Sequence, residues 1–598
     1  MEYIIGQNFY KSLPRNEKEK ILNKIKSFCE ELVRTEGIIR EISSGFWVRK
    51  IKNTNIFKFR LNSGDRFLFS YENLLFENKE TSRIVFLEFV EHDKQVRVAN
   101  RISNIEIDFL EYSVDDVEEN YDKKVVEDYY DIGNFIGYEI KSDAYLKELI
   151  DTNNSDYLYY LNKEQYQCLI EKPPVLISGS AGSGKTTIGI RKILNIEEFK
   201  NDYQKIGYFT FNNFLKEETL KVYNKYRIEE NRSVHFYTVN EFCSKKLKKE
   251  ESLFCGYRKF SKWYKKERIN SSKVLKNIDV SSIWAEIRGI IKGSMLEDWI
   301  RSLDLSLNII DFSFYKELSD KYSDFNEEER KELYNLTVEY NSWLKNNNLY
   351  DDNDLAFEIL TNIQKPEFDK FDFIVCDEVQ DLTELQIYML KELTKNGKEI
   401  YFSGDIHQII NPNYFSFGRL RNMFYSLDNI LKTPVEILSK NYRSQEKIVT
   451  LANKLSEIRK EKIGSFGSDD YLEYSIRDGK TPILMEYSKD TLEKALKMSE
   501  TNAKFVVIVP DDETAMELKG LNNNAMVRTV ADIKGLEYKY IVTVNIVTNN
   551  LKFLNGENRN SARHHFNYFY VAITRAIDEL YIIEENQENF LIKEIEGE

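Results

Sequence analysis

The sequence has few cysteines, no long apolar run and no signal-like N-terminus. Its five cysteines are scattered and form no CxxC pair, which argues against a zinc site or a disulfide framework and favours a reducing compartment. No window of about 18 uncharged apolar residues occurs, so no transmembrane helix is predicted. The first residues lack a basic segment followed by an apolar one, as a secretory signal would have. We therefore expect a cytoplasmic protein with no membrane association.

The chain also lacks an excess of positive charge, since its formal net charge is −14 over 598 residues. Phosphate contacts need lysine and arginine, so this balance alone does not suggest a nucleic-acid protein. The charge is unevenly distributed, however. Residues 1–101 contain 19 Lys/Arg and 14 Asp/Glu, whereas residues 102–156 contain 4 and 16. A basic channel is therefore compatible with the negative net charge of the whole chain.

Three zones follow one another along the chain. Residues 1–101 combine a helical pattern with strand-like runs, which predicts a small α+β unit. Residues 102–156 form an acidic, tyrosine-rich connector. From about residue 157 on, short apolar strands alternate with amphipathic helices, which favours an α/β fold with parallel sheets covered by helices on both faces.

A glycine-rich loop follows an apolar strand in PPVLISGSAGSGKTT at 173–187, where 179–186 fit GxxxxGK[ST]. Such a loop curls its backbone N–H groups around phosphates, and the next helix presents its positive end to the same charge. Lys185 is predicted to reach the β and γ phosphates of ATP, and Thr186 to hold Mg²⁺. The residues expected to bind the nucleotide here are Gly179, Gly182, Gly184, Lys185, Thr186 and Thr187.

A second apolar strand ends in two carboxylates, in FDFIVCDEVQD at 371–381. Open parallel sheets bind their ligands at the carboxyl ends of strands, so these side chains are expected near the phosphates. Asp377 suits a Mg²⁺ contact, and Glu378 suits a general base for the attacking water.

These motifs, with GDIHQ at 404–408 and NYRS at 441–444, resemble the UvrD/Rep group of superfamily 1 DNA helicases from about 157 to 585. The resemblance implies two RecA-like P-loop motor domains. It places the first at 157–242 and 351–430, a helical insertion at 243–350, and the second at 431–598. Only about 85 residues separate NYRS from the next motif, so the large accessory insertion of the second motor domain is expected to be absent or vestigial.

The resemblance also implies roles for single residues. Gln165 would contact adenine and Glu537 the ribose, while Arg443 and the arginine finger Arg575 would contact the γ-phosphate. Gln380 and Gln408 would connect the γ-phosphate to the strand. The residues implied or proposed to contact nucleic acid are Asn212, Thr238, Tyr414, Phe417 and Thr529. The two aromatic residues could equally be core residues.

Two departures from the family pattern concern the coupling of ATP to the strand. The motif TxHxxKGLEF has Ala531 in place of its histidine, and SARHHFN at 561–567 replaces an acidic–basic run. We also expect the four tryptophans of the insertion (Trp263, Trp284, Trp299 and Trp343) to lie on helices over the strand channel.

Residues 1–101 resemble the RelE/ParE group of toxin folds more weakly, through FYKSLP and the run WVRKI to RVANR. If this domain is a ribonuclease, its cleft residues by position are Lys58, Arg60, Arg66 and His92. A role in docking nucleic acid or a protein partner, or as a structural cap, remains open. The acidic connector could cover the cleft or serve only as a linker.

Three functions follow from these patterns. The first is an ATP-driven helicase or translocase with 3′–5′ polarity on single-stranded or tailed DNA, or on RNA, in DNA repair or antiviral defence. The second is an ATPase that senses nucleic acid and controls an N-terminal ribonuclease. The third is a switch that changes partners without unwinding. The sequence leaves the oligomeric state open.

Overall fold

The computed structural model describes most of residues 2–593. The residues outside the description are 1, 7–8, 10–12, 14–17, 36–40, 43, 52–53, 55, 63, 77–78, 103–117, 120–136, 141–157, 159–160, 200–201, 228–232, 296–307, 319–322, 364, 366–367, 410–414, 429–434, 465–470, 555–558, 587–590 and 594–598.

The chain divides into two compact units, which are described separately. The first unit comprises Met1–Glu171, Ile190–Asn201 and Thr219–Glu230. The second comprises Lys172–Gly189, Asp202–Glu218 and Asn231–Glu598. Two of the boundaries therefore fall inside helices α6 (Lys185–Phe199) and α7 (Asn213–Tyr226).

The first unit contains a mixed sheet in the order β6-β2-β3-β4-β5-β1-β7. Its strands are β1 (Glu2–Gly6), β2 (Arg49–Ile51), β3 (Phe57–Arg60), β4 (Asp65–Phe76), β5 (Lys79–Glu91), β6 (Glu118–Glu119) and β7 (Gly137–Ile140). β1 runs parallel to β5, and the other neighbours are antiparallel. The sequence did not predict β1. β6 and β7 lie within the segment that it assigned to the connector.

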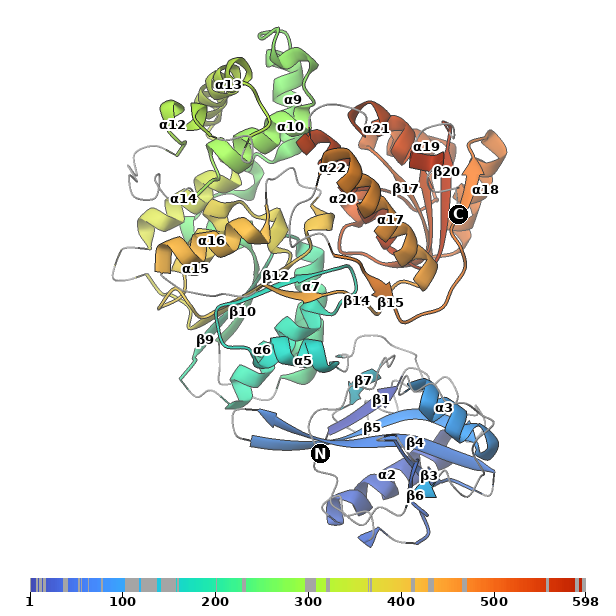
Figure 1. The fold of residues 1–598 in the computed structure, drawn as a ribbon. Helices are drawn as coiled ribbons and strands as arrows, with labels where there is room; N and C mark the ends of the chain where they lie inside the picture. The colour runs from blue at the N-terminus through green and yellow to red at the C-terminus, as the bar shows by residue number, and fades with distance from the viewer. Residues whose placement is uncertain are drawn as a thin grey trace. The chain divides into compact units, whose positions relative to one another are not determined.

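Alternation along the strands gives this sheet two apolar faces. On one face, Phe28 of α2 (Lys18–Arg34) stacks on Phe59 at 4.0 Å between ring centroids. On the other, Ala99 of α3 (Gln95–Ile102) packs in a cluster with Leu68 and Val85. Figure 1 shows the two helices on either side of the sheet. This arrangement agrees with the α+β unit predicted from the sequence.

The second unit contains two large parallel sheets and a two-stranded parallel sheet formed by β14 (Lys440–Asn441) and β15 (Tyr474–Ser475). The first large sheet has the order β10-β9-β11-β12-β8-β13. Its strands are β8 (Val175–Gly179), β9 (Lys205–Thr210), β10 (Ser233–Thr238), β11 (Phe373–Cys376), β12 (Ile400–Gly404) and β13 (Val435–Leu438). Its helices, apart from α6 and α7, include α8 (Val239–Leu247), α14 (Asp352–Asn362), α15 (Glu384–Glu392) and α16 (Phe417–Asp428). β13 pairs with β8, so the first sheet extends past the boundary expected at residue 430.

The second parallel sheet has the order β16-β20-β19-β17-β18. Its strands are β16 (Ile483–Glu486), β17 (Phe505–Val509), β18 (Val527–Thr529), β19 (Tyr538–Val544) and β20 (Ala576–Glu584). Its helices include α17 (Glu446–Ile463), α18 (Lys489–Thr501), α19 (Asp512–Leu521), α20 (Val530–Ile533), α21 (Ile546–Leu554) and α22 (Arg559–Thr574). The predicted α/β fold with parallel sheets is confirmed. We call the two sheets with their helices the first and second lobes.

Helices occupy the segment predicted to be a helical insertion (Figure 1). They include α9 (Tyr257–Trp263) with a π-helical turn at Tyr264–Arg268, α10 (Val280–Glu286), α12 (Phe312–Lys316) and α13 (Glu327–Asn346). Trp263 and Trp284 are buried in its core, Trp343 is partly buried, and Trp299 lies outside the described residues.

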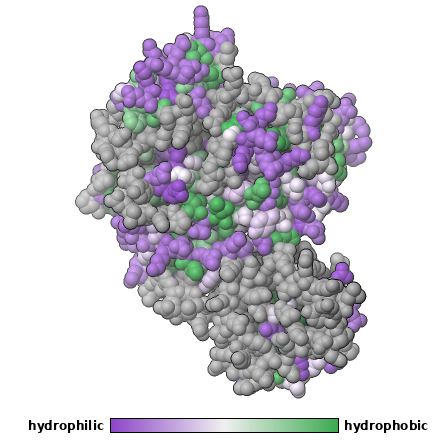
Figure 2. Space-filling view, viewed as in Figure 1, coloured by the Kyte–Doolittle hydropathy of each residue, from purple (hydrophilic) through white to green (hydrophobic). Residues whose placement is uncertain are grey.

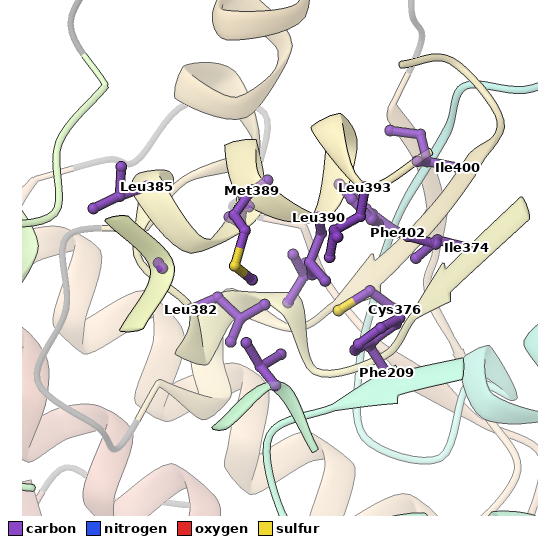
Figure 3. Close-up of a cluster of buried hydrophobic side chains, with 14 of the residues drawn as sticks. Phe209, Ile374, Cys376, Leu382, Leu385, Met389, Leu390, Leu393, Ile400 and Phe402 are labelled. Carbon is purple, nitrogen blue, oxygen red and sulfur yellow. The ribbon is translucent and has the colours of Figure 1, made fainter. Parts of the chain in front are cut away.

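The core of the first lobe lies between its sheet and helices α14 and α15. Figure 3 shows part of it, where side chains of α15 such as Met389 and Leu390 meet Cys376 of β11 and Phe402 of β12. β8, β11 and β12 are buried at every residue, as expected of parallel strands covered on both faces. In the part of the chain that the structure describes, no helix combines the length and apolarity needed to span a membrane.

Candidate nucleotide and strand-binding site

The glycine-rich loop joins the end of β8 to the first residue of α6. Gly182 and Gly184 have positive φ values of 75° and 91°. A Cβ placed on Gly182 would lie only 2.5 Å from the Cβ of Arg443, so a larger residue does not fit there. The Lys185 ammonium donates to the carbonyl oxygens of Gly179 at 2.6 Å and Ser180 at 2.8 Å. The lysine therefore lies along the loop, at a helix N-terminus suited to phosphate.

Asp377 follows β11 and lies beside Thr186 at the start of α6. The Thr186 hydroxyl donates to Oδ2 of Asp377 at 2.5 Å, and the Ser403 hydroxyl donates to Oδ1 at 2.8 Å. A hydroxyl and a carboxylate oxygen are ligands that Mg²⁺ accepts, so the pair predicted from the sequence fits this ion. Burial, and then the charge of Glu378, raises the pKa of Asp377.

Glu378 has a left-handed backbone conformation, with φ 58° and ψ 38°. This conformation is uncommon for a residue with a side chain, and such positions cluster at functional sites. Its Oε2 accepts a hydrogen bond from Gln380 Nε2 at 2.5 Å. Burial acts to raise the pKa of Glu378, but the charges of Lys534, Lys185 and Arg575 outweigh it and lower the pKa overall. An ionised carboxylate here suits a general base.

A chain of hydrogen bonds connects the first lobe to Arg575 at the end of α22. The backbone N–H of Asp405 donates to Gln380 Oε1 at 3.0 Å, and Gln408 Nε2 donates to Asp405 Oδ2 at 2.6 Å. Arg575 Nη2 donates to Gln408 Oε1 at 2.5 Å. Burial and the neighbouring Arg443 lower the pKa of Arg575 to about 10, so it is still charged at neutral pH. The two predicted glutamines thus lie in one network with the predicted arginine finger.

The second lobe also approaches the glycine-rich loop through Arg443. The backbone N–H of Tyr442 donates to Gly182 O at 3.1 Å, and that of Arg443 donates to Asn441 Oδ1 at 2.9 Å. The Arg443 guanidinium forms an ion pair with Glu537. The two side chains predicted to contact the γ-phosphate and the ribose therefore lie together beside the loop.

Sequence analysis missed two buried residues that join the lobes. Lys534 forms an ion pair with Asp381 and donates to the carbonyl oxygen of Gln408 at 2.5 Å. The Lys534 ammonium also lies 4.0 Å from Glu378 Oε2. Asp381 ends the run FDFIVCDEVQD, and Lys534 is the lysine of the segment that matches TxHxxKGLEF, but nothing in the sequence indicates that they pair. Asp405 was missed in the same way.

The strand-contact candidates Asn212, Thr238 and Thr529 all lie at helix N-termini. Asn212 Oδ1 accepts from Leu215 N at 2.7 Å in the first turn of α7. Thr238 and Thr529 are the N-caps of α8 and α20. A helix N-terminus favours an anion such as a strand phosphate.

Three further predicted residues occupy other positions. Gln165 lies in the first unit, where its side chain forms a capping box with Asn162 at the start of α5 (Lys163–Ile170). Thr187 lies in the first turn of α6. Phe417 is fully buried and packs against Phe415, which agrees with the core role that the sequence left open. Tyr414 lies outside the described residues.

The predicted ribonuclease residues belong to the first unit. Lys58 is buried and donates to Gln95 Oε1 of α3 at 3.0 Å, and Arg66 is buried near the turn at residues 62–65. The two cations lie 5.2 and 5.6 Å from the ring centroid of Trp47, a residue that the sequence analysis missed. Arg60 is exposed and donates to Asn62 O. His92 is partly exposed, with its Nδ1 at 3.0 Å from Asp93.

The comparisons with known proteins point to helicases. Residues 161–417 match the UvrD/REP helicase N-terminal domain family. The chain is 25% identical over 301 residues to the ATP-dependent DNA helicase Rep of Buchnera aphidicola, which is 47% of this chain and 40% of that protein. It is 23% identical over 475 residues to a probable DNA helicase of Mycoplasma pneumoniae, 72% of this chain and 84% of that protein.

A third similar protein is TPR and ankyrin repeat-containing protein 1 of Homo sapiens, with 24% identity over 290 residues, 44% of this chain and 10% of that protein. The chain thus spans less than half of the length of the human and Buchnera proteins. Residues 161–417 are therefore similar to the N-terminal domain of UvrD/REP helicases. The family match begins at residue 161, so the resemblance of residues 1–101 to toxin folds stays a prediction.

Proposed function

We propose that this chain is an ATP-dependent DNA helicase or translocase that hydrolyses ATP when it binds single-stranded DNA. The observation that supports the proposal most is the network across the lobes. Glu378 of the first lobe is connected through Gln380, Asp405 and Gln408 to Arg575 of the second. A general base and an arginine finger on opposite lobes can act together only when the lobes meet around a triphosphate.

The proposed hydrolysis assigns one step to each group. Lys185 would hold the β and γ phosphates, and Thr186 and Asp377 would hold Mg²⁺, which would offset phosphate charge. Glu378 accepts a proton from the water that attacks the γ-phosphorus, while the bond from that phosphorus to the bridging oxygen breaks. Arg575 and Arg443 neutralise the charge that develops on the transferring phosphoryl group. Loss of the γ-phosphate weakens the attraction between the lobes.

Movement along a strand would follow from this change in attraction. Asn212 and Thr238 belong to the first lobe and Thr529 to the second, so each lobe carries part of the strand contact. When the lobes separate and close, one contact shifts relative to the other. The family resemblance implies 3′–5′ polarity on single-stranded DNA.

The test is the rate of ATP hydrolysis against single-stranded, duplex, 3′-tailed and 5′-tailed DNA and the matching RNAs. We expect stimulation by single strands and unwinding that requires a 3′ tail. Lys185→Ala and Glu378→Gln should abolish turnover, and Glu378→Gln should still bind ATP. Persistent full activity in either variant would refute the site. Stimulation without strand separation would favour the partner-changing switch.

A second candidate is an ATPase that controls an N-terminal ribonuclease. It is favoured by the position of Lys58 and Arg66 beside one indole ring, which concentrates positive charge in the first unit. RNA cleavage that is lost in Arg66→Ala and His92→Ala, and retained in Lys185→Ala, would support this function. Absence of cleavage in the unmodified chain would reject it.

A further inference from the structure

The segment from Tyr257 to Asn277 of the insertion is strongly basic in an acidic protein. It contains eight lysines and arginines and one carboxylate, Glu267, although the whole chain has a net charge of −14. Figure 2 shows hydrophilic residues gathered over the end of the insertion that carries α9 and α13. A local charge so different from that of the whole chain calls for an anionic partner.

The helix spacing separates this segment into an apolar face and a basic face. Phe260, Trp263 and Tyr264 are buried in the core of the insertion. Lys262, Lys265 and Lys266 are exposed on the opposite side of α9 and its π-helical turn. Across the described part of the chain, no carboxylate lies within 4.0 Å of these three ammonium groups. We call Lys262, Lys265 and Lys266 the lysine stripe.

The other cations of this helix already have partners. Arg268 forms an ion pair with Glu339 at 2.7 Å, and Lys259 donates to Ser252 O at 3.1 Å. Arg258 contacts two acids of the second lobe, Asp512 at 3.0 Å and Asp532 at 3.5 Å. The lysine stripe is therefore the part of the helix that is available to an external anion.

The contacts of Arg258 connect the stripe to the strand-contact candidates. The backbone N–H of Asp532 donates to the hydroxyl of Thr529 at 3.2 Å. Arg258 lies one helical turn before Lys262, so the stripe begins close to the residue proposed to bind strand phosphate. A nucleic acid that leaves this site along α9 would meet the lysines next.

We propose that the lysine stripe binds the backbone of duplex DNA beside the strand-contact site. This deepens the proposed helicase function and rests on it. The stripe has no exposed aromatic ring, because Phe260, Trp263 and Tyr264 are buried, so it offers nothing on which unpaired bases could stack. The nine residues from Arg258 to Lys266 extend about 12 Å, a length of duplex axis that carries roughly seven phosphates. In a duplex the faces of the bases are stacked on one another and the phosphates lie outside, so ammonium groups can contact the backbone without stacking on a base.

The test measures binding of a blunt duplex to the full chain, without ATP, by fluorescence anisotropy from 50 to 200 mM salt. The variant Lys262→Gln/Lys265→Gln/Lys266→Gln removes three phosphate contacts. The slope of log affinity against log salt should then fall by about 2.7. Between these salt concentrations the unmodified chain should lose about 40-fold more affinity than the variant. The matched control is Lys489→Gln/Lys494→Gln/Lys497→Gln on α18, which should keep the original slope.

An unchanged slope in the stripe variant overturns the proposal, and so does a loss confined to single-stranded DNA. ATP hydrolysis stimulated by single strands is measured on the same variants. This second measurement separates failure of the lysine-stripe proposal from failure of the proposed helicase function. The stripe variant should retain that activity, which also reports that it is folded. If the unmodified chain shows no stimulated hydrolysis but its duplex slope falls in the stripe variant, the helicase proposal fails and the binding surface stands.

Discussion

The ion pair between Lys534 and Asp381 allows a sharp test of how the lobes are held together. Both side chains are buried, with 6% and 1% of their surfaces exposed. Lys534 comes from the second lobe and Asp381 from the first, and the ammonium also donates to Gln408 O. We consider the substitutions Lys534→Met and Asp381→Asn, alone and together.

The expected loss of ATP affinity follows from the burial of both charges. Removing one partner of a buried pair costs about 3–5 kcal/mol, because the other charge stays buried without compensation. Since the pair joins the lobes, this cost falls on the closed arrangement more than on the folding of either lobe. A loss of about 3 kcal/mol lowers the population of the closed arrangement, and hence the apparent affinity for ATP, roughly 150-fold. In the double variant neither member of the Lys534–Asp381 pair is left as a single buried charge. The loss in the double variant should therefore fall short of the sum of the two single losses by about 0.5–3 kcal/mol.

The assay is equilibrium binding of a fluorescent, non-hydrolysable ATP analogue. Binding is preferred to turnover because the Lys534 ammonium lies 4.0 Å from Glu378 and its loss would also alter the proposed base. The matched control is Lys539→Met, which changes a lysine on β19 with 48% of its side chain exposed. The control should bind the analogue like the unmodified chain.

Two results would refute this reasoning. In the first, Lys534→Met binds the analogue as tightly as the unmodified chain. In the second, the double variant loses the full sum of the two single losses. Either result would mean that the pair does not stabilise the arrangement that binds ATP.

Three further predictions concern the same site. Arg575→Ala should lower the rate of ATP hydrolysis about 10³-fold or more at saturating ATP, while the affinity for the ATP analogue changes far less. A steady-state rate within tenfold of the original would show that Arg575 is not the arginine finger. Thr186→Ala should raise the Mg²⁺ concentration needed for half-maximal hydrolysis, and Thr186→Ser should not. If both variants need the same Mg²⁺ concentration, Thr186 does not hold the metal ion. Burial raises the pKa of Glu473 to about 7, above its usual value of about 4.3. The folded chain then holds a proton that the unfolded chain releases, so the stability present below about pH 4.3 is lost as pH rises through 7. The free energy of unfolding, measured by urea titration, should fall by about 3 kcal/mol between pH 5 and 8 in the unmodified chain. It should not fall in this way in Glu473→Gln. The same fall in both proteins would contradict the prediction.

Local patterns in the sequence were sufficient to predict a phosphate site and the groups that would act there. The glycine-rich loop, the helix that follows it and the carboxylates after an apolar strand are each specified within a few residues. In the structure the Thr186 hydroxyl donates to Asp377, and the role of the two residues at a metal ion stays a prediction. The alternation of apolar strands and helices predicted the parallel sheets for the same reason, since strands buried on both faces are apolar throughout.

Only the tertiary structure decided how distant segments meet. The pairing of Lys534 with Asp381 joins residues 153 positions apart, and no sequence pattern indicates the left-handed backbone at Glu378. The assignment of β13 to the first sheet depends on its pairing with β8, and β1 joins its sheet through residues near 84 and 138. A short motif determines which groups can react with a phosphate. Which charges face each other across two lobes depends on non-local packing, in which every element restricts the position of the others.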